Sequence, residues 1–139
     1  EFGGHSGETK KDQSAESGAY YATYATGPVS IGYSKAYKAM HLINYHSSNT
    51  SSTAAEYYDQ TNYSIAFAAS DDLSVSYERE TSEVNKLDDS TIEQESAAVQ
   101  VAYTMGGMTL AVSHASHDNN GYVDGANTDQ TLFAVTMAF

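Results

Sequence analysis

The chain has 139 residues and carries 6 Lys and Arg against 18 Asp and Glu, so its formal net charge is −12. This balance argues against nucleic-acid binding, because phosphate contacts need a basic surface. The absence of Cys excludes a disulfide framework and a thiolate metal site. Hydrophobic residues make up 40% of the chain, but many are Ala or Tyr rather than the aliphatic residues of a soluble core. The length fits a single domain over residues 1–139.

Apolar residues alternate with small or polar residues along most of the chain, and this period of two is typical of strands. For example, the apolar Val99 and Val101 flank the polar Gln100. The pattern predicts an all-β protein with about seven antiparallel strands connected up and down. We expect these strands at residues 19–26, 29–39, 61–70, 73–83, 95–105, 108–118 and 130–139.

The connections between the predicted strands alternate between short and long. Tight turns are expected at 27–28, 71–72 and 106–107. Long polar loops are expected at 40–60, 84–94 and 119–129. A soluble sandwich has no reason to alternate in this way, whereas a transmembrane β-barrel has short turns on one side and long loops on the other. In that arrangement residues 1–18 are predicted to be an extracellular loop.

No stretch approaches the roughly 18–20 apolar residues of a membrane helix, but a barrel strand needs only about 10 residues with apolar alternate positions. If the apolar positions face lipid, the small and polar positions face a lumen. We therefore predict a lumen wall that includes Lys38, Glu78, Glu80 and Gln100. Most residues on this face are Ser, Ala, Gly, Thr, Gln or Glu, and their side chains are too small to fill a narrow closed barrel. They therefore favour a wide barrel that holds water or an inserted loop.

Aromatic residues gather at the positions predicted to face lipid, where interfacial girdles form in barrels. They are Tyr33, Tyr37, Tyr63, Tyr77, Tyr103, Phe133 and Phe139. Ordinary β-propensity is the alternative explanation, because Tyr favours any strand, and the girdle is the interpretation that we favour. Lys35 and Arg79 fall on the same face, where a cation costs about 2–4 kcal/mol at mid-bilayer. They could snorkel, turn inward at a bulge or lie under a neighbouring subunit; our hypothesis is that they contact lipopolysaccharide phosphates.

No pattern of residues predicts catalysis, a metal site or a cofactor. His114 and His117 are three apart, so in a strand they point to opposite faces and cannot easily share an ion. The acidic segment around Gly121 lacks the spacing and the closing Glu of a calcium-binding loop. Glu78 and Glu80 share a face without an apolar pocket to separate their pKa values, and no nucleophile motif is present. We expect that the protein is not an enzyme.

The last strand resembles the C-terminal signature of bacterial outer-membrane proteins, which is a terminal aromatic preceded by apolar residues at alternate positions. The residues that carry this resemblance are Phe133, Val135, Met137 and Phe139. It implies a strand that closes a barrel and is recognised by the barrel-assembly machinery. The rhythm of hairpins and loops over 19–139 is similar, more loosely, to that of general trimeric porins of alphaproteobacterial type.

This resemblance implies a Gram-negative outer-membrane pore for passive diffusion of small hydrophilic solutes and ions. It also implies a homotrimer in contact with lipopolysaccharide and outer-membrane lipid. General porins have about 16 strands, so the chain would be the C-terminal part of a larger barrel. The constriction-loop residues of the family match no position here. The excess of acid predicts a mild preference for cations.

Three alternatives remain open at this point. The first is a small closed outer-membrane barrel of eight strands with an adhesion or structural role, which needs one more strand within 1–18. The second is a secreted soluble β-rich binding module, which would need no detergent for extraction. The third is an outer-membrane enzyme, although no catalytic group can be recognised.

Overall fold

A computed structural model describes residues 2–5, 15–41 and 53–138 of the chain. In this part the protein is all-β apart from one short 3-10 helix, η1 (Asn120–Tyr122). The strands are β1 (Phe2–His5), β2 (Ala15–Thr26), β3 (Val29–Ala39), β4 (Ala55–Ala68), β5 (Leu73–Lys86), β6 (Thr91–Met105), β7 (Met108–Asp118) and β8 (Thr128–Met137).

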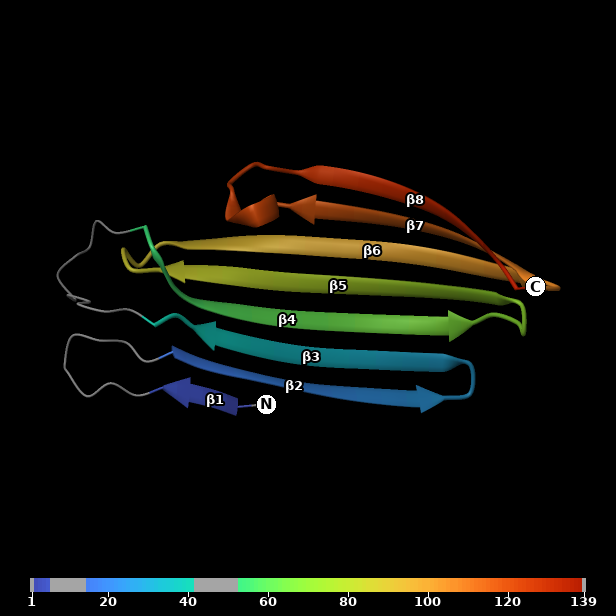
Figure 1. Cartoon of the computed structure of the whole chain (residues 1–139), viewed down its shortest axis with the longest axis horizontal. Coiled ribbons are helices and arrows are strands. Elements are labelled where there is room, and N and C mark those ends of the chain that lie inside the picture. Colours follow the sequence, from blue (N-terminus) through green and yellow to red (C-terminus); the bar gives the residue numbers. More distant parts are fainter. Residues whose placement is uncertain (1, 6–14, 42–52, 139) are drawn as a thin grey trace.

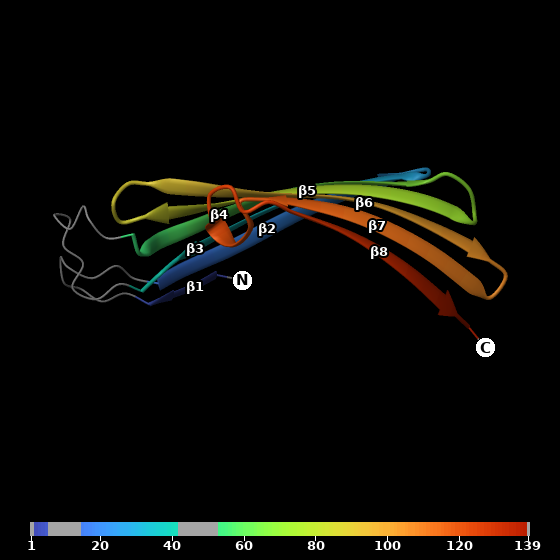
Figure 2. The same cartoon turned by 90° about the horizontal axis from the view of Figure 1, so that it is seen from above.

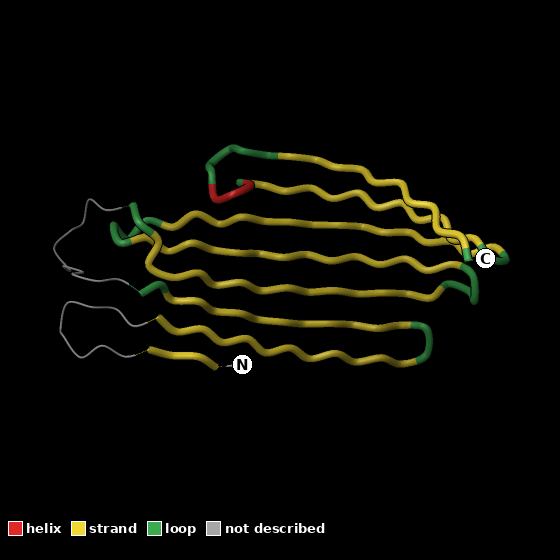
Figure 3. Tube along the Cα trace, in the orientation of Figure 1, coloured by secondary structure: helices red, strands yellow, loops and turns green. Residues whose placement is uncertain are grey.

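All eight strands form one sheet in which each strand pairs antiparallel with the next along the chain (Figure 1). The order is therefore up and down from β1 to β8, and the trace in Figure 3 shows the same succession of long strands and short turns. Seen from above, the sheet is strongly twisted (Figure 2), as the right-handed twist of its strands requires. β1 and β8 form its two edges, so the described sheet is not closed.

The seven predicted strands are all present, but the prediction for residues 1–18 needs correction. This interval contains β1 and the beginning of β2, which pair from Phe2 opposite Gly18 to His5 opposite Ala15. The sequence Phe-Gly-Gly-His has no alternation of apolar and polar residues. It forms a strand by pairing its backbone with an existing strand, and backbone pairing leaves no trace in a hydrophobic pattern.

The long loop predicted at 84–94 is wrong. β5 and β6 remain paired as far as Asn85 opposite Thr91, and only residues 87–90 connect them. Polar and apolar residues still alternate here, but the two faces exchange their character. Glu83 and Glu93 occupy the face that is apolar nearer to the turns at 71–72 and 106–107. The acidic composition therefore suggested a loop where the backbone continues as a hairpin. The β4 strand likewise begins at Ala55, inside the predicted loop 40–60.

The sheet has almost no interior of its own. Ala39 and Val84 are the only buried hydrophobic residues in the described part of the chain. The chain exposes 9583 Å², whereas a compact protein of its 14.9 kDa would expose about 7,000 Å². Most of the apolar surface of this sheet is therefore not covered by the described part of the chain.

The register places the two interleaved sets of side chains on opposite faces across β2–β8. We call one the aromatic face; it carries, among others, Tyr33, Tyr63, Arg79, Val99 and Val112. We call the other the small-residue face; it carries, among others, Gly32, Ser64, Glu78, Ala98 and Ala115. We call the two ends of the sheet the turn end, with the connections 27–28, 69–72 and 106–107, and the loop end.

Two hairpins at the turn end depend on glycine. Gly27 has φ 54° and Gly106 has φ 61°, each at the first position of a two-residue turn. A positive φ at this position is the feature of type II′ turns, whose twist matches that of the flanking strands. Only glycine adopts this conformation without steric cost. The turn composition seen in the sequence thus has a direct backbone cause.

We predict that Gly106→Ala lowers the free energy of unfolding by about 1 kcal/mol or more, because an L-residue is disfavoured at the positive φ of this turn position. A Cβ at Gly106 would meet no atom within 4 Å, so the whole effect comes from the backbone. Thermal unfolding followed by circular dichroism measures it. Gly106→Asn is the matched control, since Asn is, after Gly, among the residues that occur at the positive-φ positions of such turns. Equal losses in the two variants would contradict the assignment.

Candidate functional site

The aromatic face is exposed although it is apolar. Apart from Tyr21, Leu132 and Val123, every exposed large hydrophobic residue in the described ranges lies on this face. Phe133 is 73% exposed and Met105 is 57% exposed. The apolar surface runs across the sheet from β2 to β8 at the turn end. A continuous apolar surface of this extent marks a contact with a membrane or with another protein.

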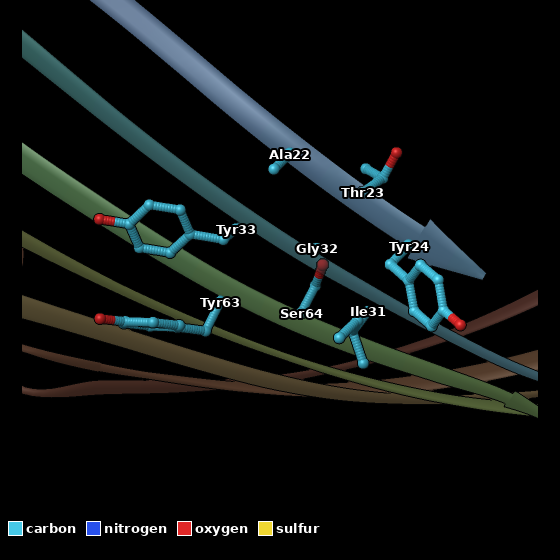
Figure 4. A pocket seen from close by; sticks show the side chains of 8 residues that line it. All are labelled: Ala22, Thr23, Tyr24, Ile31, Gly32, Tyr33, Tyr63 and Ser64. Atoms are coloured by element: carbon cyan, nitrogen blue, oxygen red, sulfur yellow. The ribbon is translucent and has the colours of Figure 1, made fainter. Parts of the chain in front are cut away.

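A hollow of about 400 Å³ interrupts the aromatic face near β2 (Figure 4). The rings of Tyr33 and Tyr63 lie side by side at one end of it, with centroids 5.2 Å apart, and Tyr24 lies at the other end. Its floor is low because Ala22 carries only a methyl group between the larger neighbours. The hollow is apolar and open, so it suits a hydrocarbon chain better than a polar ligand.

On the aromatic face of the described strands, charged groups occur only from the row of Arg79 toward the loop end. Arg79 forms an ion pair with Glu95 of the neighbouring strand. Lys35 lies in the row of Tyr20 and Thr61, and it makes no salt bridge within the described residues. The two cations that the sequence placed on one face are therefore not equivalent, because only the charge of Arg79 is matched.

A row of carboxylates follows closer to the loop end of the same face. Asp59, Glu83 and Glu93 are direct cross-strand neighbours on β4, β5 and β6. Like charges in opposite positions destabilise a sheet. In the described chain no group of three or more His, Cys, Asp or Glu side chains is arranged to hold a metal ion. This row is therefore best understood as a hydrated acidic rim.

The small-residue face carries the residues predicted to line a lumen. Glu78 and Glu80 project from β5 beside a shallow hollow of about 80 Å³. The floor of this hollow includes Ala98 and Ala115, and His117 lies on its far side. Asn62 donates a side-chain hydrogen bond to Glu78. Two carboxylates and an imidazole thus border a part of the face where small side chains leave space.

Lys38 and Gln100 share this face with Glu78 and Glu80 but do not join them. Lys38 is opposite Tyr58 near the loop end, and Gln100 is opposite Ser76 toward the turn end. Both side chains are exposed. The four predicted wall residues are consequently spread along the face, as the wall of a passage would be, and they do not form one compact site.

The segment 119–127, which we call the β7–β8 loop, folds back over the small-residue face. Its Tyr122 hydroxyl is 2.6 Å from Ser82 Oγ, and its ring packs on Tyr58 with centroids 5.5 Å apart. Ser82 is 7% exposed and Val84 is 3% exposed in this region. Sequence reasoning missed this contact. The available signal was the pair Val84 and Ile92, which are apolar at positions of the otherwise small-residue face.

The two histidines of β7 lie on opposite faces. His114 Nδ1 is 2.9 Å from Thr131 Oγ1 on the aromatic face, and His117 Nδ1 is 2.9 Å from Ser96 Oγ on the small-residue face. The expectation from their spacing is confirmed. Each imidazole is held by a hydroxyl of a neighbouring strand, so the pair does not form a common ligand set.

The residues of the C-terminal signature lie on the aromatic face of the edge strand. Phe133, Val135 and Met137 are opposite Val112, Leu110 and Met108 of β7. All three signature residues are more than half exposed. Phe139 lies outside the described residues. The outer edge of β8 has no partner strand in the described part of the chain, so its ladder groups are available for pairing.

The short connection 87–90 is closed by Asp88, whose Oδ1 accepts hydrogen bonds from Ser90 Oγ at 2.5 Å and from Ser90 N at 3.0 Å. The Ser90 hydroxyl contributes most to lowering the pKa of the Asp88 carboxyl below its ordinary value, and the Ser90 amide adds to it. Asp89 has φ 61° in this turn. These local bonds explain why an acidic segment turns within four residues.

In comparisons with known proteins, no family model, no curated protein and no solved structure matches the chain. Among the described residues, no helix combines the length and the apolar character needed to cross a membrane. Any functional assignment therefore has to rest on the two faces of the sheet and the residues they carry.

We predict that Ser90→Ala raises the pKa of Asp88 toward the ordinary value of a carboxyl group. Because the pKa is lowered in the folded state, this interaction stabilises the turn above the ordinary carboxyl pKa. The stabilisation is lost as the pH falls through the lowered value. Carboxyl carbon shifts followed by NMR against pH measure the change. An Asp88 titration identical in the two proteins would contradict it.

Proposed function

We propose that the chain is part of an outer-membrane β-barrel pore of the porin type, through which small hydrophilic solutes and ions diffuse passively. The observation that carries this proposal is the segregation of side chains on one sheet. An uncovered apolar face lies on one side, and a face of small and polar residues lies on the other. A lipid-facing exterior and a hydrated lumen require this division.

Strand length agrees with a membrane span. β4 and β5 have 14 residues each and β6 has 15, whereas a spanning strand needs about 9–11. At about 3.3 Å per residue and a tilt of about 40°, such strands rise about 35 Å, which exceeds the roughly 30 Å hydrocarbon core. The acidic rim and the loops then lie outside the hydrocarbon.

The open edges support a barrel larger than the described sheet. In lipid, every backbone N–H and C=O group needs a partner, so open edges do not persist there. β1 pairs only with Ala15–Gly18, which leaves the outer edge of β2 from Ala19 to Thr26 free in the described structure. We propose that further strands complete a barrel of about 16. A homotrimer and recognition by the barrel-assembly machinery belong to the same proposal.

One observation favours the second candidate, a small closed barrel with an adhesion or structural role. β1 supplies the eighth strand that this alternative needs. However, β1 has 4 residues while β8 has 10, so their pairing would close only part of the edge. Narrow barrels also fill their interiors with side chains, and the small-residue face leaves hollows. The porin proposal therefore accounts for more of the structure.

The cations on the aromatic face fit the outer boundary of a membrane. Lys35 has no salt bridge among the described residues, so its ammonium group is the one we propose for contact with a lipopolysaccharide phosphate. Arg79 already has Glu95. Its pairing within the sheet replaces the lipopolysaccharide contact as the way in which this guanidinium is accommodated beside lipid.

We predict that the Glu78→Gln/Glu80→Gln double variant lowers the cation-to-anion permeability ratio about threefold. This is equivalent to a change in local potential of about half a kT per unit charge, because the potential acts on cations and anions in opposite senses. Reversal potentials across a planar bilayer with a salt gradient measure it. Glu83→Gln/Glu93→Gln is the matched control, since it removes two carboxylates of β5 and the adjacent β6 from the opposite face. A shift of equal size in the control, or a wild type that prefers anions, would contradict the proposal.

We also predict that Glu95→Gln lowers the thermal stability of the detergent-solubilised protein and does so more strongly in lipid bilayers. The variant leaves the Arg79 guanidinium without its carboxylate next to hydrocarbon, where a cation is costly. Glu93→Gln, one row farther toward the loops, is the control and should not lower the thermal stability, because it relieves the like-charge repulsion from Glu83. If Glu95→Gln were as stable as the control in both environments, the aromatic face would not border lipid.

A further inference from the structure

The β7–β8 loop makes specific contacts with strands that are distant from its own. Tyr122 passes over β6 and β5 to reach Tyr58 on β4, and its hydroxyl meets Ser82 on the way. Nearer to β6, the Gly121 amide donates to Gln94 Oε1 at 2.7 Å. The loop therefore spans three strands of the small-residue face at its loop end.

The loop is also braced internally. Asn119 Oδ1 accepts the Gly125 amide at 2.9 Å, and the Asn120 amide donates to the Ala126 carbonyl at 2.7 Å. Asn119 Nδ2 donates to the Glu93 carbonyl at 2.8 Å, which ties this bracing to β6. A loop that served only to connect β7 with β8 would not need this number of hydrogen bonds.

Two residues of the loop other than glycine have a positive backbone φ, which is an unfavourable conformation for most L-residues. Asn119 has φ 52° and Tyr122 has φ 60°. Asn tolerates this region, but for a bulky residue such as Tyr it is an outlier. Such conformations persist where the surrounding contacts determine them. Here the contacts of the Tyr122 ring and hydroxyl on the sheet oppose the strain, so the docked position is specified by the side chain.

We propose that the β7–β8 loop is a fixed constriction of the pore and that Tyr122 determines the size of the solute that passes. This inference rests on the proposed function. On β5, Ser82 lies one row above Glu80 and two rows above Glu78. A solute that enters along this wall from the loop end therefore meets Tyr122 before it reaches the carboxylates. The loop selects by size, and the carboxylates below it select by charge.

The docking is tested first, without reference to transport. The chain has no Cys, so Ser82→Cys introduces a single thiol directly beneath the Tyr122 hydroxyl. In the native protein we expect this thiol to react slowly with a water-soluble maleimide. Adding Tyr122→Ala should raise the rate roughly tenfold or more, because the cover is removed. Adding Val123→Ala, a change at the exposed neighbouring residue, should leave the rate unchanged.

The constriction is tested on the same loop in the wild-type background. Tyr122→Ala should increase single-channel conductance and should admit larger neutral sugars in liposome swelling, whereas Val123→Ala should do neither. Tyr122→Phe retains the ring but loses the bond to Ser82. It should keep the size limit of the wild type and raise the hydrogen-exchange rate of the Gly121 amide about fivefold, the equivalent of one hydrogen bond.

The outcomes separate this inference from the proposed function. A thiol that reacts equally fast with and without Tyr122 overturns the docked loop, whatever the protein conducts. A protected thiol together with unchanged conductance and sugar limit in Tyr122→Ala overturns the constriction and leaves the pore proposal intact. A protected thiol in a protein that conducts no ions overturns the pore and the constriction together. Protection, with a larger conductance only in Tyr122→Ala, supports the inference.

Discussion

The strand register is the constraint on which the rest of the structure depends. In a pleated strand successive side chains point to opposite faces, so a slip of one residue would exchange the two faces of the sheet. The observed pairing keeps Tyr63 beside Arg79 and Ser64 beside Glu78 across the same two strands. Glycines at the first turn positions hold the hairpins in this pairing. The aromatic face, the acidic rim and the proposed lumen wall all follow from that alignment.

The alternation reverses its sense toward the loop end, and this reversal gives the sheet its one small buried cluster in the described part of the chain. Below it, large apolar residues lie on the aromatic face and remain exposed. Above it, Val84 and Tyr58 lie on the small-residue face, where Tyr122 packs beside them. The same strands thus present apolar surface outward over the proposed hydrocarbon depth and inward where the β7–β8 loop docks. A single register serves both purposes because only the residue types change.

The stable form of such a sheet depends on whether water or lipid surrounds it. In water, an uncovered apolar face and two open edges would drive association, since both the hydrophobic effect and unpaired backbone groups favour it. In a bilayer the apolar face is favourable because it contacts lipid, whereas the open edges must be paired by closing the sheet. The ion pair between Arg79 and Glu95 fits the same environment, because it matches a cation at the upper margin of the apolar band. These three features are explained together by the proposed pore.

The sequence by itself determined the class of the fold, seven of the eight strands of the described residues and the assignment of their side chains to faces. A period of two has only one structural meaning, so the alternation alone places Glu78, Glu80 and Gln100 on one face. Only the tertiary structure revealed β1, the hairpin of β5 and β6 and the ion pair of Arg79. It also revealed the docking of Tyr122 on Ser82. These features depend on backbone pairing and on contacts between distant residues, neither of which produces a local pattern. A sequence records which way each side chain points, but the partner that it meets is decided by the folded chain.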